Sequence, residues 1–285
     1  MSAKLLKSPF EREFRAALSQ ARKEVVFSSP YINDAGASVF VESIRKTACK
    51  NIRILTNLSA RNIIDNVTQP QALLNICDAF EDTTISSLER LHAKVYIVDN
   101  LFAVITSANL TNGGLRSNFE YGVIFDEPAT VKKIKKDVLD YASLGHIFDK
   151  EFLSKIYEES KKIEKIQADT QRNGSGLKKL IAGHQKVELI LTNRYEDTET
   201  RHSIFTKTIM FLLQKHKQLT THELYDFVRD IHPEMCDDKI EYHNEKRWKI
   251  EVRQALFFWR RKGMVLGEGP VHHQIWSLAP TYKAE

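Results

Sequence analysis

The chain has 285 residues, of which 42% are hydrophobic, so it can bury the core of one large domain or of two smaller ones. Its formal net charge of +5 is compatible with a nucleic-acid partner but does not require one. The sequence has no apolar run near the ~20 residues of a membrane helix, no apolar leader, and only three, widely spaced, cysteines. We therefore expect a soluble, cytoplasmic protein with no membrane partner and no disulfide framework.

The first 150 residues alternate predicted helices and strands, which favours an α/β layered domain. In chain order, the predicted elements are a helix at 9–21, a strand at 24–32, a helix at 37–48, a strand at 52–57, a helix at 69–80, two strands built on 95–98 and 101–105, a strand at 119–127 and a helix at 128–144. A proline near the start of the last helix is typical of a first helical turn.

The composition changes after residue 150. Residues 151–185 are rich in Lys, Glu, Gln and Ser and include QRNGSG at 171–176, which indicates a charged helix that runs into a flexible break. We therefore predict three parts, which are a domain at 1–150, a charged helical linker at 151–200 and a second domain at 201–285.

The last third has a different pattern. Helices are predicted at 203–217, 220–231 and 246–263, followed by two short strands around a Gly-Glu-Gly-Pro turn within 264–278. Thr220 and Glu223 have the spacing of a capping box, and Gly263 would close the third helix. Three helices followed by a β-hairpin are typical of a winged helix-turn-helix domain.

Polar residues stand at the ends of the hydrophobic hairpin LHAKVYIVDNLFAVITSANLTNGG, residues 91–114. Because strand side chains alternate, His92 and Lys94 share a face, and Ser107 and Asn109 do likewise. If the two runs pair, all four polar groups gather at one end of a sheet. The buried faces are assigned to Ala93, Val95, Ile97, Ala103 and Ile105. The hairpin is thus interpreted as a rigid platform with a polar site at its end.

These side chains suit phosphoryl transfer. An imidazole can attack phosphorus and form a covalent phosphohistidine. An ammonium, a hydroxyl and an amide can bind the nonbridging oxygens as charge develops on them. A carboxylate can fix the orientation of the imidazole, and Glu120 on the next strand is the candidate for this role.

The stretch HAKVYIVD, six further residues and TSAN resemble the HxK-x4-D-x6-G-S-x-N signature of the phospholipase D superfamily. The residues in register are His92, Lys94, Asp99, Ser107 and Asn109. Thr106 stands where the family usually has Gly, and SNFEYGVIF resembles the segment that follows the motif. The resemblance extends over about residues 1–145 and implies a mixed sheet flanked by helices, an α/β fold.

The resemblance also implies roles for the residues. His92 would be the nucleophile, and Lys94 and the Ser107–Asn109 pair would bind phosphate. Glu120 would orient His92, and Asp99 would be a structural or orienting partner. The family works without a metal, and no zinc-type spacing is present, so we expect neither a metal nor another cofactor.

The family uses two such motifs per active site, because a second histidine protonates the leaving oxygen. The other H-x-K in this chain, His184 to Lys186, has no Asp at the required place and no S-x-N. A single good copy therefore predicts a homodimer through the nuclease domain, in which two His92 side chains face each other across a two-fold axis.

Each motif residue also has a plain structural interpretation. A lone histidine at a strand end is usually satisfied by hydrogen bonds, and Ser107 and Asn109 alone would be turn formers. Glu120 alone would be a surface charge, and Asp99 with Asn100 alone would be a hairpin turn signal. Five residues in register favour the catalytic interpretation.

The third helix of the C-terminal domain is strongly basic and is predicted to enter the major groove of double-stranded DNA. The predicted DNA contacts are Lys246, Arg247, Lys249, Arg253, Arg260, Arg261, His272 and His273. The predicted core side of this helix is Ile250, Val252, Leu256 and Trp259. Alternatively, the basic run at 260–262 is a solvated helix end, His272 and His273 form a solvated turn, and the domain binds protein instead.

The whole pattern resembles restriction endonucleases that carry a phospholipase D catalytic domain. We therefore predict a homodimeric, metal-independent DNA endonuclease of a restriction or phage-defence system. Three alternatives remain open at this point. They are a non-catalytic DNA-binding regulator, a subunit of a larger assembly with a helicase or methyltransferase, and a phospholipid hydrolase or transferase.

Overall fold

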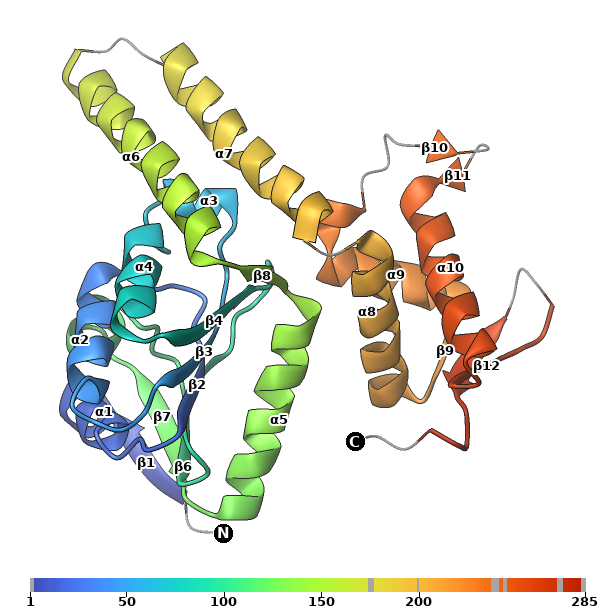
Figure 1. The fold of residues 1–285 in the computed structure, drawn as a ribbon, viewed down its shortest axis with the longest axis horizontal. Helices are drawn as coiled ribbons and strands as arrows, with labels where there is room; N and C mark the ends of the chain where they lie inside the picture. Colours follow the sequence, from blue (N-terminus) through green and yellow to red (C-terminus); the bar gives the residue numbers. More distant parts are fainter. Residues whose placement is uncertain are drawn as a thin grey trace. The chain divides into compact units, whose positions relative to one another are not determined.

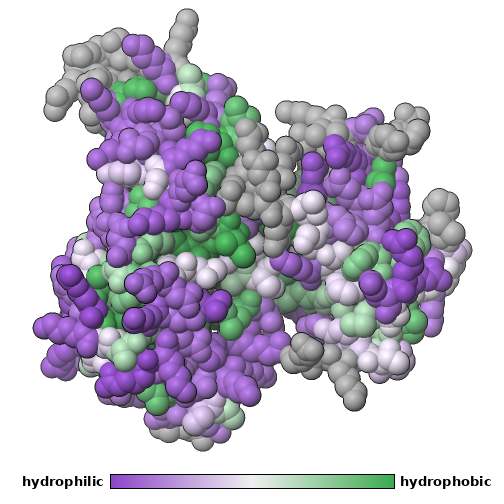
Figure 2. Space-filling view, viewed as in Figure 1, coloured by the Kyte–Doolittle hydropathy of each residue, from purple (hydrophilic) through white to green (hydrophobic). Residues whose placement is uncertain are grey.

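The computed structural model describes residues 3–173, 177–198, 200–236, 241–242, 245–270 and 274–282. The chain forms two compact units, unit 1 at residues 1–191 and unit 2 at residues 192–285. Hydrophilic residues cover most of the visible surface of each unit (Figure 2). In the described ranges, none of the helices combines the length and apolar character needed to cross a bilayer.

Unit 1 is built on one eight-stranded sheet with the strand order β1-β7-β6-β5-β2-β3-β4-β8 (Figure 1). The strands are β1 (Ala3–Lys7), β2 (Glu24–Ser28), β3 (Asn51–Thr56), β4 (Asp82–Ser87), β5 (Lys94–Val98), β6 (Phe102–Thr106), β7 (Tyr121–Phe125) and β8 (His146–Phe148). Strand β3 is parallel to both of its neighbours, and all other pairs are antiparallel. The predicted α/β fold with a large mixed sheet is thus confirmed.

Helices cover both faces of this sheet, again as predicted. The helices of unit 1 are α1 (Glu11–Leu18), α2 (Asp34–Ile44), α3 (Ala60–Ile64), α4 (Pro70–Ala79), the π-helical turn η1 (Gly113–Ser117), α5 (Pro128–Leu144) and α6 (Lys150–Asn173). Helix α5 lies on one face, and α1, α2 and α4 lie on the other (Figure 1). Helix α6 packs against α3 and α4, and α7 (Leu177–Thr198) follows it in the chain.

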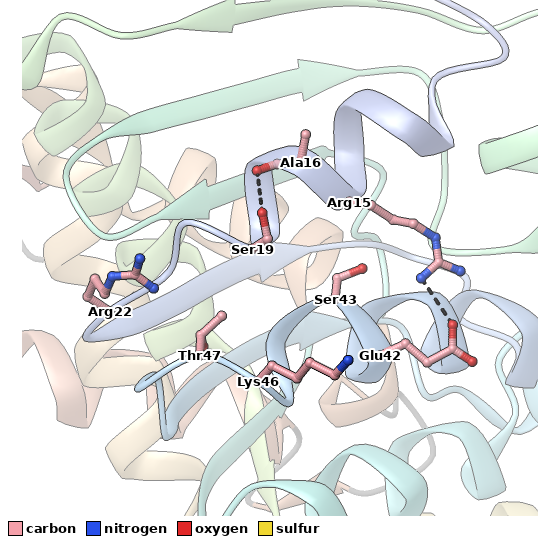
Figure 3. A pocket seen from close by; sticks show the side chains of 8 residues that line it. All are labelled: Arg15, Ala16, Ser19, Arg22, Glu42, Ser43, Lys46 and Thr47. Atoms are coloured by element: carbon pink, nitrogen blue, oxygen red, sulfur yellow. Dashed lines mark hydrogen bonds and ion pairs between the residues drawn. The ribbon is translucent and has the colours of Figure 1, made fainter.

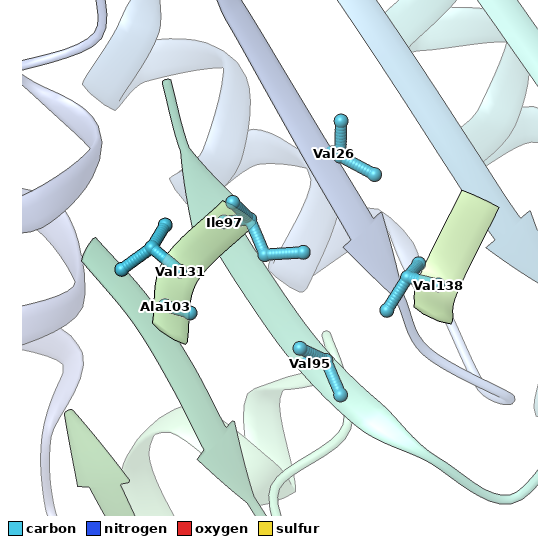
Figure 4. Packing of buried hydrophobic residues seen from close by; sticks show 6 residues of the cluster. All are labelled: Val26, Val95, Ile97, Ala103, Val131 and Val138. Atoms are coloured by element: carbon cyan, nitrogen blue, oxygen red, sulfur yellow. The ribbon is translucent and has the colours of Figure 1, made fainter. Parts of the chain in front are cut away.

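The core beneath α5 fixes the hairpin that carries the motif. The buried cluster consists of Val26, Val95, Ile97, Ala103, Val131 and Val138 (Figure 4). Ala93 packs against this cluster and is partly buried. The prediction that Ile105 is buried is wrong, because its side chain is 41% exposed. Ile105 lies near the end of β6, outside the cluster that α5 covers.

In its described residues, unit 2 contains the helices α8, α9 and α10, a three-stranded antiparallel sheet in the order β12-β13-β9 and a two-stranded sheet of β10 and β11. Its elements are α8 (Arg201–His216), β9 (Gln218–Thr220), α9 (Thr221–Ile231), the 3-10 turn η2 (Pro233–Met235), β10 (Glu241–Tyr242), β11 (Glu245–Lys246), α10 (Arg247–Arg261), β12 (Val265–Glu268) and β13 (Ile275–Leu278). The core of unit 2 includes Trp248 and Trp276, each 1% exposed.

Two local signals of the sequence are confirmed in unit 2. The Thr220 hydroxyl accepts a hydrogen bond from the backbone N–H of Glu223 at 3.2 Å, and the Glu223 carboxylate accepts one from the backbone N–H of Thr220 at 2.7 Å. This is the predicted capping box. Gly263 has a φ of 68°, the left-handed conformation that ends a helix, so it does close α10.

Candidate active site

The hairpin of β5 and β6 brings the two halves of the motif to one end of the sheet. Lys94 is paired with Thr106 in the register of the two strands. The residues that precede Lys94 and those that follow Thr106 therefore leave the sheet at the same end of the two strands. Because all five residues of β5 are buried, the strand that supports this end of the sheet is firmly packed.

His92 and Lys94 contact each other directly. The Lys94 Nζ lies 3.1 Å from the Nε2 of His92 and donates a hydrogen bond to the His92 carbonyl oxygen at 2.8 Å. Because an ammonium can only donate, its contact with Nε2 requires that this nitrogen carry no proton. In this arrangement the Nε2 lone pair accepts the hydrogen bond from Lys94, and it becomes available for attack on phosphorus when the ammonium binds substrate oxygens instead. The His92 side chain itself is exposed.

The Lys94 residue is only 7% exposed. Burial lowers the pKa of Lys94 below its usual value, and the negative charge of Glu120 opposes that shift. The site thus combines a partly desolvated cation with an exposed nitrogen.

The Glu120 carboxylate forms the second half of the site. It accepts a hydrogen bond from the Ser107 hydroxyl and another from the Asn118 amide at 3.2 Å. Its backbone N–H donates to the Ser8 hydroxyl at 2.8 Å. The structure thus pairs Glu120 with Ser107, whereas the sequence interpretation paired it with His92.

Asn109 lies in the loop after β6, and this loop is held against the loop after β2. Its Oδ1 accepts a hydrogen bond from the backbone N–H of Tyr31 at 3.3 Å. The next residue, Leu110, donates its N–H to the Ser29 hydroxyl at 2.9 Å. Gly36 packs against the Leu110 carbonyl so closely that a Cβ would lie 2.0 Å from its oxygen. Within the described ranges, the Asn109 amide nitrogen donates no hydrogen bond to another protein group.

Thr106 departs from the family signature, and the strand opposite accommodates it. Gly122 is the direct cross-strand partner of Thr106. A Cβ at Gly122 would lie 2.9 Å from the Thr106 Cβ and 2.9 Å from the Ile105 carbonyl oxygen. The Thr106 hydroxyl donates to the Tyr121 carbonyl at 3.0 Å and accepts from the Ala108 N–H at 3.2 Å. Because Gly122 has no side chain, there is room for the Thr106 side chain where the family signature has glycine.

Asp99 lies at the opposite end of β5, about 17 Å from Lys94 along the strand. Its carboxylate accepts hydrogen bonds from the backbone N–H groups of Arg22, Lys23 and Glu24, each at 2.9 Å. Its φ of 51° is left-handed, which Asp tolerates better than most residues. Asp99 therefore joins the β5–β6 turn to the start of β2 and is remote from the reactive groups.

Residues 14–140 match the family model described as Cardiolipin synthase, PLD-like domain. This range contains the whole motif from His92 to Glu120, with the geometry described above. This part of the chain is a PLD-like domain. Among the described residues, no group of three or more His, Cys, Asp and Glu side chains is placed to hold a metal ion.

Solved structures similar to the chain have low sequence identity. Nuc, a phospholipase D family member from Salmonella typhimurium, has a TM-score of 0.43 and 18% identity, covering 52% of this chain and 97% of that chain. NucT from Helicobacter pylori has a TM-score of 0.39 and 18% identity, covering 48% and 93%. TrmBL2, an archaeal chromatin protein, has a TM-score of 0.37 and 12% identity, covering 51% and 54%. No curated protein matches the chain.

Sequence reasoning missed three residues that build the site of the PLD-like domain. They are Ser8, Tyr31 and Asn118, which hold Glu120 and Asn109 through the hydrogen bonds described above. Asn118 lies in a segment that the resemblance already covered. Ser8 is 112 residues from Glu120 along the chain, and no local pattern predicts such a contact.

An apolar patch lies over the β1, β7 and β6 part of the sheet, and its strand residues are on the face opposite to Lys94 and Thr106. It consists of Leu5, Ile105, Phe119 and Tyr121, whose exposed fractions are 64%, 41%, 104% and 55%. Val123 links Leu5 and Ile105, because it is the cross-strand partner of both. Phe119 and Tyr121 flank the candidate carboxylate Glu120 in the chain. A patch of large apolar side chains beside polar groups is a common mark of an interaction surface.

The PLD-like domain also has a pocket of about 580 Å³ between α1 and α2 (Figure 3). It is lined by Arg15, Ala16, Ser19, Arg22, Glu42, Ser43, Lys46 and Thr47. Arg15 and Glu42 form an ion pair of 3.0 Å at its edge. None of the motif residues lines this pocket, so it is separate from the candidate active site.

The second H-x-K sequence lies on a helix. His184 and Lys186 are part of α7, where residues two apart point in different directions. Lys186 forms an ion pair with Glu159 at 2.9 Å. This geometry differs from the strand arrangement of His92 and Lys94, in which both side chains meet.

The basic residues predicted to bind DNA lie on or beside α10, except His272 and His273, which fall outside the described residues. Lys246 is paired with Glu241, and Arg247 with Glu251 at 3.0 Å. The Lys249 ammonium lies 5.3 Å from the centre of the Tyr225 ring.

The arginine in the middle of α10 and the two arginines at its end differ in the contacts that they make within unit 2. Arg253 donates to both carboxylate oxygens of Glu245 and to the Tyr225 hydroxyl at 2.8 Å. Arg260 and Arg261 are exposed, and within the described residues their side chains make no ion pair or hydrogen bond. Arg253 is thus already bound inside unit 2, while the two terminal arginines are available to a partner.

Proposed function

We propose that the PLD-like domain is a phosphodiesterase that cuts double-stranded DNA as a homodimer, without a metal ion. The observation that carries this proposal is the contact of 3.1 Å between His92 Nε2 and Lys94 Nζ, beside the Ser107–Glu120 pair. An unprotonated ring nitrogen next to a fixed cation and further hydrogen-bond donors meets the requirements of phosphoryl transfer.

In the first step, the Nε2 lone pair of His92 forms a bond to phosphorus. The bond between phosphorus and the leaving oxygen breaks, and that oxygen takes a proton from an acid. In the second step, water attacks phosphorus, the phosphorus–nitrogen bond breaks, and the proton of the water goes to the conjugate base of the acid. Lys94 and Asn109 stabilise the nonbridging oxygens in both steps, and Glu120 holds the Ser107 hydroxyl in place.

The acid would be His92 of a second copy of the chain. Two observations support the dimer. The chain has a single complete motif, whose His92 cannot be nucleophile and acid at the same time. The exposed apolar patch of Leu5, Ile105, Phe119 and Tyr121 offers a surface that a second copy would bury.

Unit 2 would bring the PLD-like domain to DNA as a winged helix-turn-helix domain. The order of three helices and a three-stranded antiparallel sheet supports this assignment. In this proposal α10 is the recognition helix, and Lys249, Arg260 and Arg261 are its most available cations. Arg253 stabilises unit 2 through Glu245 and would contribute little to DNA binding.

A DNA-cutting domain joined to a DNA-reading domain is suited to restriction or phage defence, and we propose this role. Because a free nuclease would endanger the host genome, its activity would depend on the sequence or modification of the DNA. A helicase or methyltransferase partner is a second way to impose such control. Both are proposals about unit 2 and its partners, and they do not affect the chemistry at His92.

The direct test is cleavage of unmodified and modified plasmid DNA by the full chain in excess EDTA, beside the His92→Ala variant. The proposal expects cleavage that survives EDTA and that falls more than about 1,000-fold in the variant. A matched control is Leu101→Ala, which removes an exposed apolar side chain from the far turn of the same hairpin and should leave cleavage unchanged.

Other outcomes would identify a different function. Cleavage abolished by EDTA would contradict the metal-free mechanism. Release of headgroups from phospholipid vesicles, with DNA left intact, would instead identify a phospholipid hydrolase. DNA binding without cleavage of any DNA would favour a regulator or a subunit that needs a partner.

A further inference from the structure

One face of α10 carries side chains that unit 2 leaves exposed or covers only in part. Residues 247, 250, 254, 257 and 261 follow the 3-4-3-4 spacing of a single helical stripe. This stripe reads Arg, Ile, Gln, Phe, Arg, and the Phe257 ring at its centre is 41% exposed. On the other side of the helix, Val252 and Leu256 are fully buried. An exposed phenylalanine between two arginines calls for a partner with both apolar and anionic groups.

The charges around this stripe are positive. Lys249 and Arg260 flank it on one side, and its ends are Arg247 and Arg261. The acidic residue of α10, Glu251, is 14% exposed and is already bound by Arg247 and by Arg201. The surface therefore favours an anionic partner over a neutral or basic one.

The Phe257 ring is held in place from below. It packs edge-on against the Trp276 ring, with centroids 5.9 Å apart and an interplanar angle of 83°. Trp276 is 1% exposed, and its indole N–H donates to the Thr221 hydroxyl at 3.0 Å. Phe257 is thus a rigid apolar projection, and little conformational entropy would be lost when it contacts a partner.

We propose that this stripe reads an A·T base pair in the major groove of DNA. The Phe257 ring would contact the C5-methyl group of thymine, and the Gln254 amide would form paired hydrogen bonds with N6 and N7 of the adenine. Arg247 and Arg261 are 14 positions apart, or ~21 Å along the helix, so they would reach phosphates on both sides of a groove about 12 Å wide. Arg247 would exchange its Glu251 partner for a phosphate in this complex. The proposal rests on the proposed DNA-reading role of unit 2.

The test separates the methyl group from the rest of the base pair. Duplexes with a randomised core of sixteen or so base pairs are selected for binding to the full chain, and the bound sequences are read. The best duplex is then synthesised again with deoxyuridine in place of thymidine, which removes only the methyl groups. The proposal expects A·T pairs in the selected core and binding that weakens about 5- to 10-fold on the uracil duplex.

Variants assign the effect to single side chains. Phe257→Ala should bind the thymine and uracil duplexes equally well, and Gln254→Ala should lose the preference for A·T over G·C. Leu101→Ala, which removes an apolar side chain of similar exposure from unit 1, should keep the full thymine-to-uracil difference. Equal binding of both duplexes by the unchanged chain would overturn the proposal without any variant.

Two further outcomes would also overturn it. If Phe257→Ala keeps the thymine-to-uracil difference but changes the oligomeric mass of the chain, the stripe is a protein interface. If the full chain binds no duplex at all, the DNA-reading role of unit 2 fails together with the proposal. DNA binding that is indifferent to the methyl group removes only the A·T reading and leaves that role intact.

Discussion

The two ends of the β5–β6 hairpin carry residues of one sequence motif and use them differently. At one end, Lys94 is buried with a lowered pKa, and its ammonium contacts the exposed ring of His92. At the other end, the Asp99 carboxylate accepts three backbone hydrogen bonds of 2.9 Å. The first end holds a charge at a cost in stability, and the second end uses a charge to gain stability.

This difference separates chemistry from architecture within a single motif. A reactive end needs groups that are incompletely satisfied, so that a substrate can complete their interactions. A structural end needs the opposite, because every unsatisfied polar group near the core weakens the fold. Substitutions at the two ends should therefore affect activity and stability in opposite proportions.

After the loss of His92 itself, the largest expected effect on activity, with the least loss of stability, is that of Lys94→Met. Removal of the ammonium should lower phosphodiesterase activity on bis(p-nitrophenyl) phosphate by about 100- to 1,000-fold. Because burial disfavours the charged lysine, the free energy of unfolding should stay the same or rise by about 1 kcal/mol. Denaturant titration alongside the activity assay checks both, and a large loss of stability would place Lys94 among the structural residues.

Asp99→Ala should have the reverse effect. It removes the acceptor of three backbone N–H groups and places Ala at a φ of 51°, so the free energy of unfolding should fall by about 2 to 4 kcal/mol. Activity per folded molecule should stay within about 3-fold of the unchanged chain, since the site lies ~17 Å away. Asp99→Asn, which keeps one acceptor oxygen and tolerates the same φ, should lose less stability. Full stability with lost activity would reverse the assignment of the two ends.

The pair of Thr106 and Gly122 offers a smaller test at the reactive end. Gly122→Ala should lower the free energy of unfolding by about 1 to 3 kcal/mol, because the new Cβ meets Thr106 and the Ile105 carbonyl. Adding Thr106→Gly should restore only part of this loss, since the contact with the carbonyl remains. Thermal unfolding of the single and double variants measures the coupling. Simple additivity of the two changes would show that the residues do not compensate each other.

The smallest effect concerns acid stability. Arg116 and Arg15 lower the pKa of Glu11 from 4.5 to about 2. A carboxylate with a lowered pKa stabilises the fold above pH 4.5, and this contribution is lost as the pH falls toward 2. Glu11→Gln should therefore be less stable than the unchanged chain at pH 6, by about 1 kcal/mol or less because the partners are partly exposed, and the difference should vanish near pH 2. A difference independent of pH would indicate lost packing instead.

The sequence was sufficient to predict the layers of unit 1 and the end of the sheet at which the motif gathers. Alternating apolar runs and helical spacing are local properties, and so are the capping box at Thr220 and the terminal Gly263. The short strands β1, β4 and β8 were not predicted. Each is stabilised by its partner in the sheet rather than by a strong pattern of its own, which single-chain periodicity does not reveal.

The contacts that support the site could not be predicted from local sequence patterns either, because they join residues that are distant in the chain. Ser8 holds Glu120 from 112 residues away, and Tyr31 holds Asn109 through the loop after β2. Ile105 follows the alternation of a buried strand, yet α5 does not extend over it. Tertiary packing determines the contacts and the burial of these residues. The sequence motif therefore predicted the reactive side chains but not the residues that surround them.

The most direct test of the account is detection of the covalent intermediate. The full chain would be mixed rapidly with bis(p-nitrophenyl) phosphate, quenched in alkali, and measured by intact mass and peptide mapping. The account predicts a burst of nitrophenolate and a nitrophenyl phosphate group bonded to His92, both absent from His92→Ala. Turnover with no adduct, or an adduct on another residue such as Ser107, would contradict it.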